Sequence, residues 1–169
     1  MSLRVSSLVV SLVLLAGSAT TARAQVRARA AAEDSTMVTL ALAVGGTRLE
    51  EAKRGRCVHA PVASIYGTMA KMWSVDYAPV SGRSLSLTVW RPMTGDSTAQ
   101  LSFSVSTKGK SQRIATVKGG SIVGKGSVQV TKRGEGGRFD INGTTDDGAA
   151  VRGSVACEKF AAPAPVGGN

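Results

Sequence analysis

The feature that most constrains this chain is a strict alternation of apolar residues with serine and threonine. In residues 84–89 and again in residues 101–106, every second side chain is apolar and the side chains between them are hydroxyl-bearing. This period of two places the apolar groups on one face of an extended strand. Large apolar residues also recur at every second position in residues 38–44, 128–130 and 139–141, and Val151 and Val155 keep the same parity. We therefore expect a chain built from half-buried β-strands.

Glycine-rich turns separate these segments at intervals of about 10 to 15 residues, a spacing typical of antiparallel hairpins. The turns fall at residues 94–96, 108–110, 118–120, 134–137 and 146–148. Strands are predicted near residues 36–44, 73–78, 84–91, 99–106, 112–117, 121–132, 138–145 and 149–158. Residues 49–54 are predicted as one helical turn, and residues 61–72 as a short helix or an irregular strand. The predicted fold is all-β: an antiparallel β-sandwich or a small β-barrel of about 7–8 strands.

The N-terminus has the pattern of a secretory signal peptide over residues 1–24. Arg4 precedes an apolar run at residues 8–16, and the pattern Ala-Arg-Ala ends at Ala24. That run is too short to span a bilayer, which needs about 20 apolar residues. An organelle transit peptide is the other alternative, because no acid precedes Glu33. The short signal and the Ala-, Gly- and Arg-rich composition favour a bacterial protein exported to the periplasm or beyond the cell.

The predicted organisation after cleavage is a single domain with two tails. Residues 25–34 are expected to be flexible, residues 35–160 to form the all-β domain, and residues 161–169 to be a disordered tail. No second apolar stretch is long enough for a transmembrane segment. In an oxidising compartment Cys57 and Cys157 are expected to form a structural disulfide. A redox pair is the alternative, but the chain has no Cys-x-x-Cys arrangement.

Catalytic chemistry is poorly represented in the sequence. His59 is the only histidine, and neither a Gly-x-Ser-x-Gly elbow nor a Ser-x-x-Lys pattern occurs. A small secreted hydrolase that uses paired carboxylates stays open as an alternative. The acids considered for it are Glu50 or Glu51 with Asp76, Asp96 or Asp140. We predict that the protein is not an enzyme and has no catalytic residues.

Metal and cofactor binding are also predicted to be absent. Met69 and Met72, with His59 and Met93, carry ligand types that suit copper, but a methionine pair is equally typical of core packing. Residues 124–126 read Gly-Lys-Gly and lack the third glycine of a dinucleotide-binding loop. These residues are better explained by a bulge or twist in a long strand.

Positive charge is concentrated in one part of the chain. The whole sequence has 21 basic and 11 acidic residues. Between Thr107 and Phe139 there are eight basic residues and a single acid, Glu135. In a simple meander of strands, one end would gather the anion-binding candidates Lys108, Lys110, Lys132 and Arg133. The other end would hold Asp146, Asp147 and Lys118. Such a basic pole would attract anionic lipid or acidic polysaccharide. Nucleic acid is disfavoured because the chain shows no aromatic residues interleaved with basic ones. A basic surface that only keeps the domain soluble is the alternative.

Several segments together resemble a known family of exported domains. A strand followed by Gly45 and Gly46, a first cysteine, residues 124–131, residues 137–143 and a last strand ending at Cys157 are similar to the LpqH-type lipoprotein antigens of mycobacteria. The resemblance implies a small exported β-domain and supplies no catalytic residue. The chain differs from that family in lacking the lipid-attachment cysteine and in an apparent insertion over residues 54–79.

That insertion holds Tyr66, Trp73 and Tyr77, which are the candidates for partner contact. Core packing is the alternative, since Trp73, Val75 and Tyr77 alternate as an inward strand face would. The leading hypothesis is an exported non-enzymatic β-domain that binds or packs against an envelope component, such as an envelope protein or an anionic surface. The first alternative is an accessory subunit of a larger periplasmic or membrane-associated complex, and the oligomeric state is left open.

Overall fold

The computed structural model describes residues 34–78, 82–107 and 109–164, and within them it contains nine β-strands and no helix. The strands are β1 (Ser35–Val44), β2 (Thr47–Ile65), β3 (Thr68–Tyr77), β4 (Arg83–Pro92), β5 (Gln100–Thr107), β6 (Lys110–Ala115), β7 (Lys125–Arg133), β8 (Gly136–Thr144) and β9 (Ala150–Cys157). The all-β prediction is confirmed, with more strands than the 7–8 expected. The predicted signal peptide and the flexible segment up to Glu33 lie outside the described residues, as do residues 165–169 of the predicted tail. None of the described residues forms a helix that could cross a membrane.

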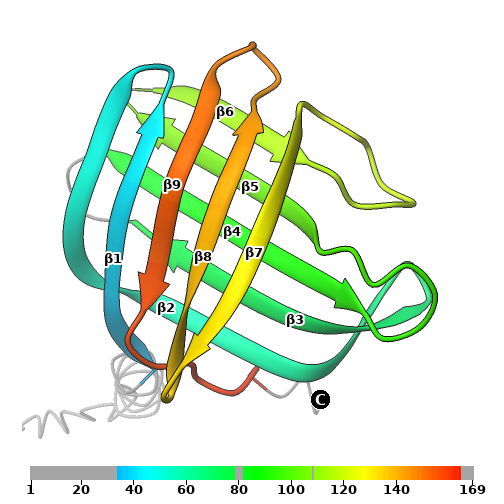
Figure 1. Ribbon diagram of the computed structural model, residues 1–169. Coiled ribbons are helices and arrows are strands. Elements are labelled where there is room, and N and C mark those ends of the chain that lie inside the picture. Colours follow the sequence, from blue (N-terminus) through cyan, green and yellow to red (C-terminus); the bar gives the residue numbers. More distant parts are fainter. Residues whose placement is uncertain (1–33, 79–81, 108, 165–169) are drawn as a thin grey trace, which may run out of the picture. The chain divides into compact units, whose positions relative to one another are not determined.

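All nine strands belong to one antiparallel sheet in the order β6-β5-β4-β3-β2-β1-β9-β8-β7. The sheet curls into a nearly closed, barrel-like form in which β1, β9, β8 and β7 lie across β3 to β6 (Figure 1). The first of the described strands, β1, is internal in this order because it pairs with β2 on one side and with β9 on the other. The core fills the space between the two layers.

Strand β2 runs through both layers and bends between them. It pairs with β1 up to Arg56 and with β3 from Arg56 onward. At the bend, a Cβ on Gly55 would lie 2.8 Å from Cγ2 of Val38, so only glycine fits without displacing a neighbour. A β-bulge follows between Ala60 and Ala63, where two residues oppose Lys71 of β3. The bend and the bulge together let one long strand join both halves of the sheet.

The expected helical turn at residues 49–54, and the helix considered for residues 61–72, are therefore wrong. Residues 49–54 pair with β1, and residues 63–65 form the β2–β3 hairpin with residues 68–70. The alternation is weak here because much of this strand is exposed on both faces. The bulge then changes the parity of the strand, so a regular period of two does not continue through it.

The predicted disulfide between Cys57 and Cys157 is present and joins the β2 bend to the end of β9. Beyond Cys157 the chain continues along β2: the His59 amide donates to the Ala161 carbonyl at 3.0 Å, and the Ala161 amide donates to the Cys57 carbonyl at 2.8 Å. The tail was predicted to be disordered from residue 161. Ala161 instead belongs to the fold, because it supplies backbone partners to the part of β2 that β1 no longer covers.

The free edge of β6 is closed by backbone bonds from two loops. The Asp146 amide donates to the Arg113 carbonyl at 3.0 Å, and the Asp146 carboxylate accepts from the Arg113 amide at 3.0 Å. Ala115 exchanges two backbone bonds, of 2.7 and 2.9 Å, with Val123. Ile114 fits against the glycines of the facing strands, since a Cβ on Gly143 would lie 2.8 Å from its Cδ1. Side-chain packing and loop contacts thus bring β6 against the opposite layer.

Candidate functional site

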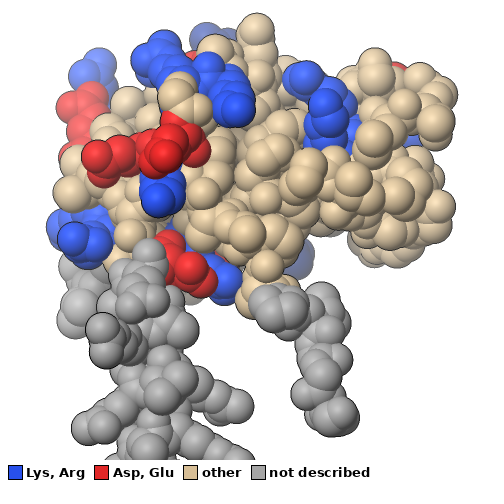
Figure 2. All heavy atoms as spheres, turned by 90° about the horizontal axis from the view of Figure 1, so that it is seen from below, with Lys and Arg blue, Asp and Glu red and all other residues tan. Residues whose placement is uncertain are grey.

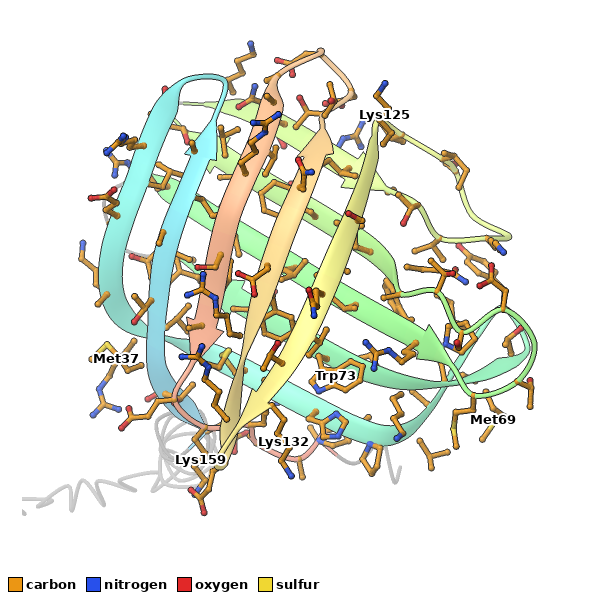
Figure 3. The ribbon with its side chains drawn as sticks, viewed as in Figure 1. Met37, Met69, Trp73, Lys125, Lys132 and Lys159 are labelled. Carbon is orange, nitrogen blue, oxygen red and sulfur yellow. A yellow bond between two sulfur atoms is a disulfide. The ribbon has the colours of Figure 1, made fainter. Side chains whose placement is uncertain are left out.

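The predicted basic pole does not form. Lys110 makes a 2.8 Å ion pair with Asp147 in the β8–β9 turn, whereas Lys132 and Arg133 lie at the β7–β8 hairpin, at the other end of β8. Figure 3 shows Lys132 at the opposite end of β7 from Lys125. Lys108 lies outside the described residues. The prediction is wrong because β7 pairs only with β8 and crosses the end of β6, instead of folding back along it as a meander requires.

The acids of the β8–β9 turn are committed to contacts within the fold. Hydrogen bonds from Lys110 and then Thr145 hold the pKa of the Asp147 carboxyl well below its usual range. The bond from the Arg113 backbone amide lowers the pKa of Asp146 in the same way. Lys118, which was expected beside these acids, pairs instead with Asp96 at 2.7 Å. The predicted separation into a basic end and an end with Asp146, Asp147 and Lys118 is therefore wrong at both ends.

Tyr77 is excluded as a partner contact because it is buried. Its side chain is 2% exposed and its hydroxyl donates to Oε2 of Glu51 at 2.7 Å. Burial and this bond raise the pKa of Tyr77 to about 12. The bond from Tyr77, with support from Arg83, lowers the pKa of Glu51. This Tyr77–Glu51–Arg83 group neutralises an inward-facing carboxylate, and both carboxylate oxygens of Glu51 are engaged within the fold.

Trp73 is half-buried and takes part in the packing of the interior. Its ring stacks on His59, with centroids 4.8 Å apart and planes inclined by 6°. The two residues face each other across β2 and β3, and Trp73 packs against the main core. Nδ1 of His59 lies 3.0 Å from the Met72 carbonyl oxygen, so this nitrogen carries the proton and donates it. The core alternative thus describes Trp73 better than partner contact does.

Tyr66, the third aromatic candidate, lies at the tip of the β2–β3 hairpin and is 69% exposed. Its backbone has φ of 46°, the only positive value for a non-glycine residue among those described. The ring covers the backbone of Gly119 and Gly120 in the β6–β7 loop: a Cβ on Gly120 would lie 2.9 Å from the Tyr66 hydroxyl oxygen. Gly119 also has a φ of 88°, which favours glycine at this position, and the small residues let the Tyr66 ring lie directly on the loop.

A cleft of about 370 Å³ opens where this hairpin, the outer face of β4 and β5, and the β6–β7 loop come together. Ile65 and Val117 are buried beneath it and pack with Trp90, which forms part of its wall. The remaining lining includes hydroxyl-bearing and small residues: Ser64, Ser102, Ala115, Gly120 and Ser121. The cleft combines an apolar floor with a polar rim, and no charged side chain lines it.

Exposed apolar side chains are concentrated at the end of the domain that carries this cleft. Met69 and Met93 do not border the cleft itself: they lie on the opposite face of β3 and β4, because the alternating neighbours Ala70 and Trp90 pack on the cleft side. Six large apolar side chains are exposed among the described residues, and all but Met37 belong to this end of the domain. We call these five the tip surface: Val62, Tyr66, Met69, Met93 and Ile122. Met69 lies at the start of β3, next to the β2–β3 turn (Figure 3). The Met93 amide donates to the Met69 carbonyl at 2.9 Å, which places the two methionines on neighbouring strands.

Two cations stand directly behind the methionines. Lys71 and Arg91 face each other across β3 and β4. Each lies two residues from a methionine of its own strand, so Met69, Lys71, Arg91 and Met93 share one face of the sheet. Both cations are exposed, and neither has an ion pair within the part of the chain that the structure describes. No local sequence pattern links Lys71 to Arg91, because they are adjacent only across the strands.

The residues considered for paired-carboxylate catalysis and for copper binding are not brought together among the described residues. Asp96 pairs with Lys118 and Asp140 with Arg138, while Asp76 accepts a hydrogen bond from Ser86. Met69 and Met72 are three residues apart on a strand and so point to opposite faces. Over the described ranges, no group of three or more His, Cys, Asp or Glu side chains is arranged to hold a metal ion.

Comparisons with protein-family models, with curated proteins and with solved structures found no match to this chain. The resemblance to exported lipoprotein antigens therefore stays a prediction.

Proposed function

We propose that this chain is an exported, non-enzymatic β-domain that binds a component of the cell envelope through its tip surface. The observation that carries the proposal is the gathering of Val62, Tyr66, Met69, Met93 and Ile122 at one end of a domain whose other large apolar side chains are mostly buried. Figure 2 shows that charged side chains of both signs crowd one end of the visible face, while the opposite end is mostly uncharged. Apolar patches of this kind mark interaction sites on soluble domains.

The fold supports a binding role because it fixes this surface firmly. The hairpin that carries Tyr66 and Met69 continues directly into β2 and β3, which span the domain. The β6–β7 loop that carries Ile122 is held by Lys118, whose amide donates to Gln100 at 2.8 Å and whose ammonium pairs with Asp96. A surface held in place before binding loses less conformational entropy when its partner arrives.

The experiment is co-sedimentation of the purified chain, beginning at Gln25, with the envelope fraction of its own cells. All nine strands are kept in this form. We expect the wild-type chain to sediment with the envelope, and the double variant Met69→Ser/Met93→Ser to stay largely in the supernatant. Met37→Ser is the matched control, because Met37 is 41% exposed but lies on β1, outside the tip surface. Equal sedimentation of all three proteins would show that the tip surface is not the binding surface.

A further inference from the structure

We infer that the envelope component bound by the tip surface is a lipid bilayer that contains anionic lipid. This inference rests on the proposed function and names its partner. Its basis is the juxtaposition of an apolar end with two unpaired cations on the same face of β3 and β4.

The spacing of these groups fits the layers of a bilayer surface. Lys71 and Arg91 each lie two residues behind Met69 and Met93 along their strands. Two residues of extended strand span about 7 Å, close to the depth at which peripheral apolar groups enter a membrane. With the methionines placed among the upper acyl chains, the ammonium and guanidinium groups stand at the level of the lipid phosphates.

The charges favour an anionic partner over a neutral one. Like charges directly opposite each other on neighbouring strands destabilise a sheet. Lys71 and Arg91 are such a pair, and Asp96, the acid of the nearby β4–β5 loop, is already bound by Lys118. An anionic lipid headgroup between the two cations would remove their repulsion. The folded domain thus presents positive charge that no described acid neutralises.

The apolar residues favour a bilayer over an acidic polysaccharide. A polysaccharide would engage the cations, but it would leave Met69, Met93 and Ile122 in water. Tyr66 adds a ring with a hydroxyl at its end, an amphipathic group that is enriched where hydrocarbon meets headgroups. Only a partner with an apolar interior and an anionic surface can contact the apolar tip surface and pair with the cations Lys71 and Arg91 at the same time.

The test is co-sedimentation of the chain from Gln25 with vesicles of phosphatidylcholine alone, and with vesicles of equal parts phosphatidylcholine and phosphatidylglycerol. We expect binding to the anionic vesicles and little binding to the neutral ones. Because each cation near an anionic surface contributes about a fivefold change in affinity, Lys71→Gln/Arg91→Gln is expected to bind about 25-fold more weakly. Met69→Ser/Met93→Ser is expected to lose at least about tenfold.

Three controls match these variants. Lys125→Gln/Arg152→Gln removes two cations that line a hollow on the outer face of β7 to β9, and it is expected to lose much less affinity. Met37→Ser removes an exposed methionine of β1. Met69→Leu/Met93→Leu keeps the apolar surface and is expected to keep binding, which separates loss of contact from loss of fold. Thermal unfolding of every variant confirms that the domain is intact.

The outcomes separate this inference from the proposed function. Equal binding to neutral and anionic vesicles, or vesicle binding that neither double variant weakens, would overturn the lipid inference. So would a chain that ignores vesicles but binds alginate, an acidic polysaccharide, or a protein of the envelope fraction through the same methionines. In that last case the proposed function stands with another partner. Absence of binding both to vesicles and to the envelope fraction overturns both proposals.

Discussion

Removal of the Cys57–Cys157 disulfide is the perturbation whose effect can be worked out most directly. The cross-link joins residues separated by 100 positions and encloses β3 to β9. In the chain-entropy model, a loop of that length restricts the unfolded chain by an amount equivalent to about 4.7 kcal/mol at 25 °C. A domain of this size is stable by only about 7 to 20 kcal/mol, so the loss is a large part of the total.

The variant of choice is Cys57→Ala/Cys157→Ala, since both cysteines are buried and serine would leave hydroxyls in the core. Urea unfolding followed by tryptophan fluorescence is expected to show a loss of about 4 to 5 kcal/mol. A melting temperature about 15 °C lower should accompany it. The m-value should rise, because the uncross-linked unfolded chain exposes more surface to urea.

A loss below about 1 kcal/mol with an unchanged m-value would refute this reasoning. It would mean that the unfolded chain is already compact without the cross-link. Comparison with Cys57→Ser/Cys157→Ser separates the two contributions, because any additional loss in the serine variant reports burial of its hydroxyls.

Three further predictions concern contacts that hold the two layers together. Stability should fall as pH rises from about 10 to about 12, because Tyr77 has an ordinary pKa of 10.0 and a pKa of about 12 when folded, so the unfolded chain loses this proton first. Tyr77→Phe should flatten that part of the pH profile in urea unfolding, and should cost about 1.5 to 3 kcal/mol at neutral pH by removing the bond to the Glu51 carboxylate. Gly143→Ala should cost about 1 to 3 kcal/mol, because its Cβ would lie 2.6 Å from the Lys125 carbonyl oxygen and 2.8 Å from Cδ1 of Ile114. Adding Ile114→Val removes only the second contact and should recover a smaller part of the loss, and a strictly additive double variant in thermal unfolding would contradict the contact with Ile114. Asp146→Ala should leave part of the β6 edge unpaired and increase light scattering on storage, whereas unchanged scattering would show that the edge is protected by other means.

The alternation of apolar and hydroxyl residues was sufficient to predict most of the fold. It located β1, β4, β5, β6, β8 and β9 to within two residues at each end, because one face of each strand packs in the core. It failed for β2, whose exposed first half has little contrast between its faces and whose bulge shifts the parity. The pairing of β2 with both β1 and β3 depends on contacts between distant parts of the chain, which no local sequence pattern encodes.

The candidate site shows the same limit. Tyr66 and Tyr77 are both candidates for partner contact from the sequence, yet Tyr66 is exposed and Tyr77 is buried. The alternation of Trp73, Val75 and Tyr77 is the local signal that indicates burial of Tyr77. Lys71 and Arg91 are 20 positions apart in sequence, and only the register of β3 against β4 brings them together. The basic pole was predicted wrongly for the converse reason, since charges close in sequence were separated by the path of β7.

The internal position of β1, between β2 and β9, has a consequence for how the domain can be made. Val38 pairs with Cys157, so the first strand to leave a ribosome or a translocation channel waits for the last one before its second side is covered. During that interval the chain carries an open strand edge and must avoid pairing with other copies. Loops closed over such long sequence distances form slowly. Completion of the domain is therefore tied to release of its C-terminal segment, and a chain that stops before β9 would present two unsatisfied edges, on β1 and on β8.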